Sequence, residues 1–505
     1  MGPDFRSPES NLGDQWAQPP AAGITTDHSV EARWWQQFND PVLDTLIDRA
    51  LSDNLSLRAA GLNVLAARAQ LGIAVGSRYP QVQRITANAT ALSASESGAN
   101  TAGPADLQYQ QYGLGFEAGW ELDFWGRFQR GIEASDAALQ ASIAGYDHAT
   151  VLLIAQVAAN YTSFRSLQAQ LQISKDNLAL QNRSYQIADV LFRNGENSEL
   201  DMQQALTLLR STQATIPALE SDLRRQINAL GVLLATTPAE IIALLASPAD
   251  IPSASETIAV GLPADMLRRR PDVREAELQA RAQSARIGIA EADLYPSISL
   301  VGSIGLVAVD GTPASGVRSG NTGIGAMFNS DSISYGMGPS LNWNFLNYGR
   351  LKNNVRVQDA RLQQALELYR QTVLRAGQEV EDALAVHVGA RAQRDILADV
   401  VVAAKRSSDL ALLQYQEGLA SYQRVLDSQQ ALFAQQQRHL QARTLTTASL
   451  ISLYKSLGGG WEIRLDRPML DDATLQQMRE RTDWGELLSP TALEPPADDK
   501  HTPDW

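Results

Sequence analysis

Residues able to carry out acid–base, nucleophilic or metal chemistry are few in this sequence and widely spaced. The chain of 505 residues has no cysteine, so it offers no thiolate nucleophile, thiolate metal ligand or disulfide. Its five histidines lie at no spacing, such as His-x-x-x-His, that places two ligands on one helix face. They are His28, His148, His387, His439 and His501. We therefore predict no catalytic, metal or cofactor site.

Clusters of charge have simpler explanations than chemistry. Arg268 to Arg270 could suggest phosphate binding, but Pro271 follows at once and favours a capped helix start. The acidic groups at Glu379 to Asp382 and at Glu291 to Asp293 are typical of hydrophilic helix faces. The net charge of −14 also argues against nonspecific binding to nucleic acid. The sequence therefore predicts neither an enzyme nor a nucleic-acid-binding protein.

The most regular part of the sequence is a strand that leads almost directly into a very long helix. From Ile333 to Phe345, odd positions are apolar and even positions are Ser, Gly or Asn, which predicts a strand with one apolar and one polar face. Apolar residues then recur every three or four positions within residues 350–416, which predicts a helix of roughly 100 Å that needs packing partners along its length. This stripe comprises Leu362, Leu366, Tyr369, Val373, Ala376, Val380 and Leu384.

The same unit occurs earlier in the chain. Residues 109–124 contain a similar alternating run, and Gly126-Arg127 leads into a helix as Gly349-Arg350 does later. Shifting the later stripe back by 223 positions places it on residues that are apolar except for Thr150. These are Leu139, Ile143, Tyr146, Thr150, Leu153, Val157 and Tyr161. The chain therefore contains two tandem copies of a strand hairpin followed by long helices.

These patterns divide the chain into five segments. Residues 1–33 form an extended N-terminal arm, residues 237–262 a short side segment, and residues 461–505 a loosely held acidic tail. The first repeat, residues 34–236, contains a helix over 40–78, strands over 81–93 and 109–124, and helices over 128–193 and 198–234. The second repeat, residues 263–460, contains a helix over 271–294, strands over 297–309 and 333–346, and helices over 350–416 and 419–457. Pro217 is expected to kink or break its helix.

The sequence has no run of about 18 apolar residues and no signal-peptide pattern, so we predict that it does not span a membrane by helices. A β-barrel remains possible, because its strands carry only alternating signals of about ten residues each. Four strands are too few to close such a barrel, since even the smallest bacterial ones have about eight. Several chains would therefore have to pool their strands.

Several stretches together resemble one known family. They are Gly2 to Phe5, Trp34 to Leu43, Ile216 to Glu220, Leu262 to Glu277 and Tyr454 to Trp461. In this order they resemble outer-membrane efflux ducts of the TolC and OprM type, in the lipoprotein branch. The resemblance covers nearly all of residues 2–461 and implies a mixed α and β membrane protein. It also implies a homotrimer whose shared twelve-stranded barrel continues as an α-helical coiled-coil barrel through the periplasm.

The resemblance assigns surroundings to the two faces of the strands. Apolar side chains of the last strand would meet lipid, while its Ser, Gly and Asn side chains line a wet lumen. Glu117, Glu121 and Asp123 fall on the lumen side of the second strand. A charge on the lipid side would cost about 2 to 4 kcal/mol at the midplane, so this register is the favourable one.

The resemblance also implies a gate. The family has a Gly-x-x-x-Tyr-Leu-x-x-Leu-Asp pattern in the last long helix, whose leucine and aspartate narrow the periplasmic mouth. Gly418, Tyr422, Leu426 and Asp427 match this pattern, whereas Gln423 stands where the first leucine is usual. Three copies of Asp427 would form a carboxylate ring that favours cations and responds to pH. Asp201 is a further gate candidate.

Partners follow from the same resemblance. A periplasmic adaptor would dock on the helix turns. The adaptor would couple the channel to an inner-membrane transporter of the resistance-nodulation-division type. The docking candidates are Arg193, Asn194, Gly195, Gln416, Glu417 and Gly418. The protein would lie in the Gram-negative outer membrane, in contact with lipid. The family branch implies a lipid anchor on an N-terminal cysteine, which this sequence does not contain.

Two functions from different classes remain open. As a passive exit duct, the protein would export drugs or other small amphiphiles with energy supplied by an inner-membrane partner. As a periplasmic coiled-coil scaffold or adaptor, it would fold its strands into a soluble sheet without a membrane barrel. The two differ in one observable: a soluble sheet buries its apolar face against its own core, whereas a barrel exposes it.

Overall fold

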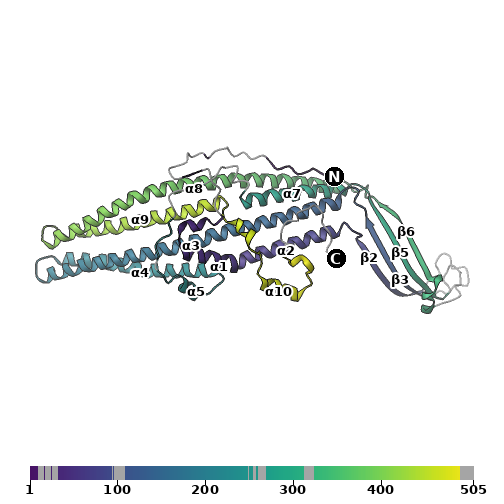
Figure 1. Cartoon of the computed structure of the whole chain (residues 1–505), viewed down its shortest axis with the longest axis horizontal. Helices are drawn as coiled ribbons and strands as arrows, with labels where there is room; N and C mark the ends of the chain where they lie inside the picture. Colours follow the sequence, from purple (N-terminus) through teal and green to yellow (C-terminus); the bar gives the residue numbers. More distant parts are fainter. Residues whose placement is uncertain are drawn as a thin grey trace.

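The chain forms an elongated body with long helices along its length and a sheet at one end (Figure 1). The computed structural model describes residues 1–8, 16, 24–25, 32–93, 95, 108–247, 249–253, 258–259, 269–311 and 323–489. His28, His501, most of the two long hairpin loops and residues 490–505 lie outside this part. The turns between the long helices lie at the end opposite the sheet (Figure 1).

Two similar sets of elements make up most of the chain. The first set is α1 (Pro41–Asp53), α2 (Leu55–Gly76), β2 (Val82–Ser93), β3 (Gln108–Glu121), α3 (Arg127–Arg193) and α4 (Glu199–Leu233). The second set is α7 (Pro271–Ala292), β5 (Ser297–Asp310), β6 (Ile333–Asn342), α8 (Arg350–Gln416) and α9 (Tyr422–Ser456). Helices α3 and α8 each have 67 residues, and α4 and α9 each have 35. The long helices of the two sets therefore match in length.

Two details of the predicted helices are wrong. The helix expected over 40–78 is broken at Asn54, whose backbone is extended. The Asn54 side chain accepts from the backbone N–H of Leu57 and donates to the carbonyl of Leu233, so it caps α2 and fixes the break. The break expected as one outcome at Pro217 does not occur, because Pro217 lies inside a continuous α4. It is exposed, so water can satisfy the carbonyl that lacks its backbone partner.

The four long strands form one antiparallel sheet in the order β2-β3-β5-β6. Directly paired residues share a face, and one row across the sheet is apolar. It runs Ile85, Phe116, Ile304 and Tyr335. The adjacent row faces the opposite side of the sheet, and in it Arg84 of β2 forms an ion pair with Glu117 of β3. β6 ends at Asn342, short of the predicted 346, where hydrogen bonding to β5 ends.

The apolar face of this sheet is open rather than packed. Ile85 is 76% exposed, Ile304 55% and Tyr335 80%. Large apolar side chains at such exposure, arranged in continuous rows, mark a surface that meets an apolar partner outside the chain. The sheet therefore does not serve as the core of this protomer.

The main core lies in the helical body. Trp34 stacks on Tyr454 with ring centroids 5.0 Å apart, and both side chains are almost fully buried. Asp40 caps α1 by accepting from the backbone N–H groups of Val42 and Leu43, and it also accepts a 2.7 Å bond from the Tyr161 hydroxyl. These contacts tie the residues before α1 to α3 and α9 in the middle of the body.

The first residues of the arm pack at the junction of sheet and helices (Figure 1). Arg130 on α3 forms a 2.6 Å ion pair with Asp4, and Ser7 donates to Glu277 on α7. Gly2 has a φ of 85° and lies against Gly288, where a Cβ would be 2.5 Å from backbone. Only glycine fits this close approach without displacement. The start of the described chain is thus held beside the inner end of the sheet.

The segment after α9 is also packed, so the prediction of a loose tail over 461–505 is wrong for residues 461–489. It contains α10 (Asp472–Arg481), and its apolar residues Leu470, Met478 and Leu488 are buried against Leu65 of α2. Ion pairs with α1, α2 and α3 fasten it to the helical body. They include Arg464 with Asp147, Arg467 with Asp48, and Asp471 with Arg58.

Within the described residues, α2 is long and apolar enough to cross a membrane by length and composition. However, α2 packs on α3 and on the C-terminal segment, with Leu57, Val64 and Leu65 buried. These two contacts account for the apolar residues of α2 that are buried.

We expect loss of Arg464 to destabilise the protein. Asp147 is 3% exposed, and burial raises its pKa to about 6 even though Arg464 opposes the shift. Removing the partner of a buried charge costs about 3–5 kcal/mol, so Arg464→Leu should lower the melting temperature of the detergent-solubilised protein at pH 8. The deficit should shrink at pH 5, where the Asp147 carboxyl is protonated and needs no partner.

The matched control is Arg479→Leu, which removes an arginine of α10 that is exposed. It should melt close to the unchanged protein at both pH values. A deficit of Arg464→Leu that is equal at pH 5 and pH 8 would contradict the role assigned to the Asp147 charge.

Candidate gate at the turns of the long helices

The two helix hairpins turn at the same end of the molecule (Figure 1). The α3–α4 turn contains Gly195 with a φ of 76°, and the α8–α9 turn contains Gly418 with a φ of 71°. Both glycines are in the left-handed region, which ends a helix at little cost for glycine. The equivalent glycines of the two repeats therefore have the same structural role.

A small apolar core holds these turns together. It comprises Ala188, Ala205, Ala411, Leu412, Tyr415, Tyr422 and Val425. Tyr422 is 1% exposed and packs edge-on against Tyr415, with ring centroids 5.3 Å apart. The hydroxyl of Tyr415 accepts a 2.9 Å bond from the Asn197 amide of the other hairpin. We call the Asn197–Tyr415 bond the tip tie, because it joins the two hairpins at their turns.

Tyr422 thus lies inside this tip core in the protomer. Burial raises the pKa of its hydroxyl well above the usual range, with Tyr415 and Asp201 adding to the effect. Asp201 lies in the first turn of α4, where burial raises its pKa. Its charge acts on the two tyrosine hydroxyls. The structure therefore places Tyr422 and Asp201 on the tip core.

Asp427 and Gln423 are separate from this core and exposed on α9. One turn apart, they are joined by a 2.8 Å hydrogen bond in which the Gln423 amide donates to an Asp427 carboxylate oxygen. Arg424, also exposed, lies between them in the sequence and was not among the predicted gate residues. The exposed face of α9 near the turn therefore carries an amide, a cation and a carboxylate within five residues.

The predicted docking residues are exposed at the turns. Arg193 pairs with Asp189 at 3.0 Å but is itself 74% exposed. Two apolar side chains that sequence reasoning missed lie beside them, Leu200 at 62% and Leu419 at 78% exposure. Neither side chain belongs to an apolar stripe with helical spacing, so the spacing of apolar residues in the sequence does not reveal them.

Other candidate sites have structural partners. His387 is buried and bonded to Ser449 at 3.1 Å, and burial lowers its pKa. Arg270 is held by Asp272 and Glu379, in keeping with a helix-start role. Among the described residues, no group of three or more His, Cys, Asp or Glu side chains could hold a metal ion.

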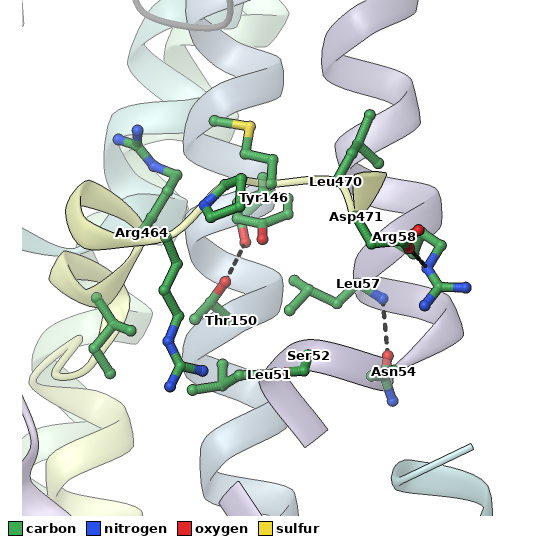
Figure 2. Close-up of a pocket in the computed structure, with 14 residues that line it drawn as sticks. Leu51, Ser52, Asn54, Leu57, Arg58, Tyr146, Thr150, Arg464, Leu470 and Asp471 are labelled. Carbon is green, nitrogen blue, oxygen red and sulfur yellow. Dashed lines mark hydrogen bonds and ion pairs between the residues drawn. The ribbon is translucent and has the colours of Figure 1, made fainter. Parts of the chain in front are cut away.

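A cavity of about 310 Å³ lies between the α1–α2 break, α3 and the C-terminal segment (Figure 2). Its lining mixes apolar side chains such as Leu57 with three arginines. The arginines are Arg58, Arg464 and Arg467, and each is paired with a carboxylate. Figure 2 shows the Arg58–Asp471 pair at its edge. These charges serve the attachment of the C-terminal segment.

Comparison with known proteins decides the family. The family described as "Outer membrane efflux protein" matches residues 46–236 and 262–459. The chain belongs to this family. CusC of Escherichia coli O6:H1, a cation efflux system protein, is 30% identical over 467 residues, which cover 92% of this chain and 96% of CusC.

Two further channels are similar over most of their length. SrpC of Pseudomonas putida, a solvent efflux pump outer membrane protein, is 31% identical over 482 residues, covering 91% of this chain and 95% of SrpC. The solved structure of the outer-membrane channel OprN has a TM-score of 0.83 and 30% identity, covering 92% of this chain and 99% of OprN. The match extends over both repeats.

The predicted fold class and function class are therefore confirmed. The protein is an outer-membrane efflux channel and not an enzyme, with a mixed α and β fold in which three chains share one barrel. It lies in the Gram-negative outer membrane and extends into the periplasm. The periplasmic scaffold is not favoured, because the apolar face of the sheet is open and the family consists of channels.

The exposed row of the sheet should tolerate no charge. Ile304 lies in the middle of β5 on the apolar face, and Ser303 beside it faces the opposite side. Ile304→Arg would place a cation in lipid at about 2–4 kcal/mol per chain, so trimer recovered from outer-membrane fractions should fall sharply. Ser303→Arg is the control and should assemble. Equal trimer yields for both variants would contradict the assignment of the two faces.

Loss of the tip tie should loosen the turns. Tyr415→Phe removes the hydroxyl that accepts from Asn197 but keeps the ring in the tip core. One such bond contributes about 1 kcal/mol, so we expect basal ion conductance of the purified channel in planar bilayers to rise about fivefold. Tyr348→Phe, which alters a 98% exposed hydroxyl far from the turns, should leave conductance unchanged. A conductance of Tyr415→Phe equal to that of this control would show that the tie does not hold the mouth.

Proposed function

We propose that this channel is a passive exit duct whose periplasmic mouth is gated by Asp427 and Gln423. The observation that supports the proposal is the exposed Gln423–Asp427 bond of 2.8 Å near the α8–α9 turn. Three chains bring together three such pairs. Carboxylates gathered around one axis repel one another and attract cations, so their separation sets both the width and the selectivity of the mouth.

The amide at Gln423 changes how such a gate closes. A leucine at this position would exclude water by an apolar constriction, whereas an amide is itself hydrated. Here the amide donates to Asp427 and so spreads the negative charge over a hydrogen-bonded pair. Arg424, three residues before Asp427, lowers the net charge of the mouth. We therefore propose a narrow polar constriction rather than an apolar plug.

We further propose that a periplasmic adaptor docks on the turns and couples the channel to an inner-membrane transporter of the resistance-nodulation-division type. The support is exposure: the predicted docking residues are exposed at the turns, and their apolar neighbours Leu200 and Leu419 are 62% and 78% exposed. An apolar side chain surrounded by polar turn residues is a typical anchor for a protein partner. Tyr422 and Asp201 would act indirectly, by holding the turn on which this surface lies.

Cargo and anchoring are finer proposals. The relatives are named for cations and for solvent, so they assign no common cargo, and we propose small amphiphiles that pass a polar lumen. We also propose that the protein is lipid-anchored close to Gly2. Residues 1–7 are held at the junction of sheet and helices, which is the level at which a barrel meets the inner lipid leaflet.

Replacing the gate residues tests the proposal. Asp427→Ala should reduce the preference for cations, because the carboxylates that attract them are gone. Gln423→Leu should lower basal conductance several-fold by creating an apolar constriction. Both are measured as conductance and reversal potential in planar bilayers, and as antibiotic efflux in a Gram-negative strain that lacks its own exit duct.

Asp53→Ala is the control, because Asp53 is an exposed carboxylate at the end of α1, away from the turns. It should restore efflux and keep the selectivity of the unchanged channel. If Asp427→Ala does not shift the reversal potential relative to Asp53→Ala, the mouth is not at Asp427.

A further inference from the structure

The interface between α3 and α9 becomes polar between the main core and the tip core. On α3, the residues facing inward are spaced three, four and three apart and lie on one stripe. On α9, two glutamines seven residues apart face this stripe. We call the six residues the polar seam: Ser174, Asn177, Gln181 and Ser184 on α3, with Gln429 and Gln436 on α9.

The seam is deeply buried. Its four α3 residues are at most 2% exposed, and Gln429 is 0% exposed. Positions of this spacing are normally apolar in a packed helix pair, because polar side chains there lower stability. Nothing in the repeat requires polarity, since the tip core on one side and the main core on the other are apolar. The seam therefore lies between the two apolar cores.

Two direct hydrogen bonds cross the seam. The Gln429 amide donates to the Ser184 hydroxyl at 2.6 Å, and the Asn177 amide donates to the Gln436 carbonyl oxygen at 2.6 Å. Because α3 and α9 run in opposite directions, both bonds belong to one register of the pair. In this register, Gln429 lies two residues from Asp427, on the same turn of α9.

Five further polar atoms of the seam have no partner among the described residues. They are the Ser174 hydroxyl, the Asn177 carbonyl oxygen, the Gln429 carbonyl oxygen and both polar atoms of the Gln181 amide. Buried polar groups are almost always hydrogen-bonded, and an unpaired one is costly. This number of unpaired polar atoms in one interface indicates that the present arrangement satisfies only part of the hydrogen-bonding capacity of these side chains.

The unpaired residues are spaced in a way that suggests a second arrangement. Ser174 lies three residues before Asn177, and Gln181 lies three residues before Ser184. Each α9 glutamine thus has another possible partner about 4.5 Å further from the turn along α3. A swing of its long side chain with a helix shift of about 1–2 Å is of the size seen when packed helices switch.

We propose that the polar seam is a two-position joint between the hairpins. In the present position, Gln429 bonds Ser184 and Asn177 bonds Gln436; in the other, Gln429 bonds Gln181 and Gln436 bonds Ser174. The change moves α9, and with it Asp427, relative to α3. The tip tie, which joins the two hairpins, resists this movement. This inference rests on the proposed gate, because it supplies the movement that opens the mouth.

The test removes the second position and leaves the first intact. The double variant Ser174→Ala with Gln181→Leu deletes only side chains that have no hydrogen bond here. We expect spontaneous openings of the purified trimer in planar bilayers to become at least ~10 times rarer, since up to two bonds per chain are lost from one state only. Amide hydrogen exchange of residues 422–440 should slow in parallel, because α9 leaves its present position less often.

The opposite variant serves as the control. Ser184→Ala removes a bond of the present position, so openings should become more frequent and exchange of residues 422–440 faster. Should the double variant fail to assemble, Gln181→Met alone deletes the same amide with little change in shape. A double variant that melts at a higher temperature while its openings and exchange stay unchanged would overturn the proposal and leave a static, hydrated seam.

The exchange measurement also separates this inference from the proposed gate. Asp427→Ala should alter selectivity without slowing exchange of α9. If Asp427→Ala has no effect on selectivity while the double variant slows exchange, the gate assignment falls and the joint stands. If selectivity responds to Asp427→Ala and exchange ignores the double variant, the gate stands and the joint falls.

Discussion

Backbone hydrogen bonding is the constraint on which the rest of this structure depends. Inside a bilayer, every unpaired backbone N–H or C=O costs several kcal/mol, and β2 and β6 each leave one edge of the four-stranded sheet unpaired. No rearrangement within one chain removes these edges. They are removed only when β6 of one protomer pairs with β2 of the next, which closes the ring of three chains. The open apolar rows, the polar opposite face and the trimer all follow from this requirement.

The helices extend the consequences of that closure across the periplasm. Helices α3 and α8, of 67 residues each, extend from the barrel toward the turns, and α4 and α9 return alongside them. The barrel sets the diameter of the tube that these helices form. In the middle, the stacked Trp34 and Tyr454 and the Asp40 cap hold the layers together. The C-terminal segment closes over this region through the buried Asp147–Arg464 pair. The body is thus rigid where the apolar contacts are continuous.

The turns are built differently from the middle. The tip core is small, and a hydrogen bond between Asn197 and Tyr415 joins the hairpins there. Between the two cores, polar side chains replace apolar ones along α3 and α9. A helix pair held by side-chain hydrogen bonds can exchange partners, whereas a close-packed apolar pair must first separate. Apolar packing therefore stabilises the body, whereas side-chain hydrogen bonds allow movement near the mouth.

Local periodicity was enough to predict much of this protein. Period-two alternation gave the strands, three-and-four spacing gave the long helices, and the match of Gly126-Arg127 to Gly349-Arg350 revealed the repeat, because these signals depend only on neighbouring residues. The resemblance then named the channel class and pointed to Asp427, but not to the bond that Gln423 makes with it.

Other features depended on contacts between residues distant in sequence. Asn54 breaks a helix because its amide reaches Leu233, and Pro217 is tolerated because it faces water, which no local pattern records. The tail packs because Leu470 and Met478 meet Leu65, about 400 residues earlier in the chain. The polar seam appears on each helix as ordinary Ser, Asn and Gln residues. Only the packing of α3 on α9 decides that they are buried, and burial is what gives them a possible role at the mouth.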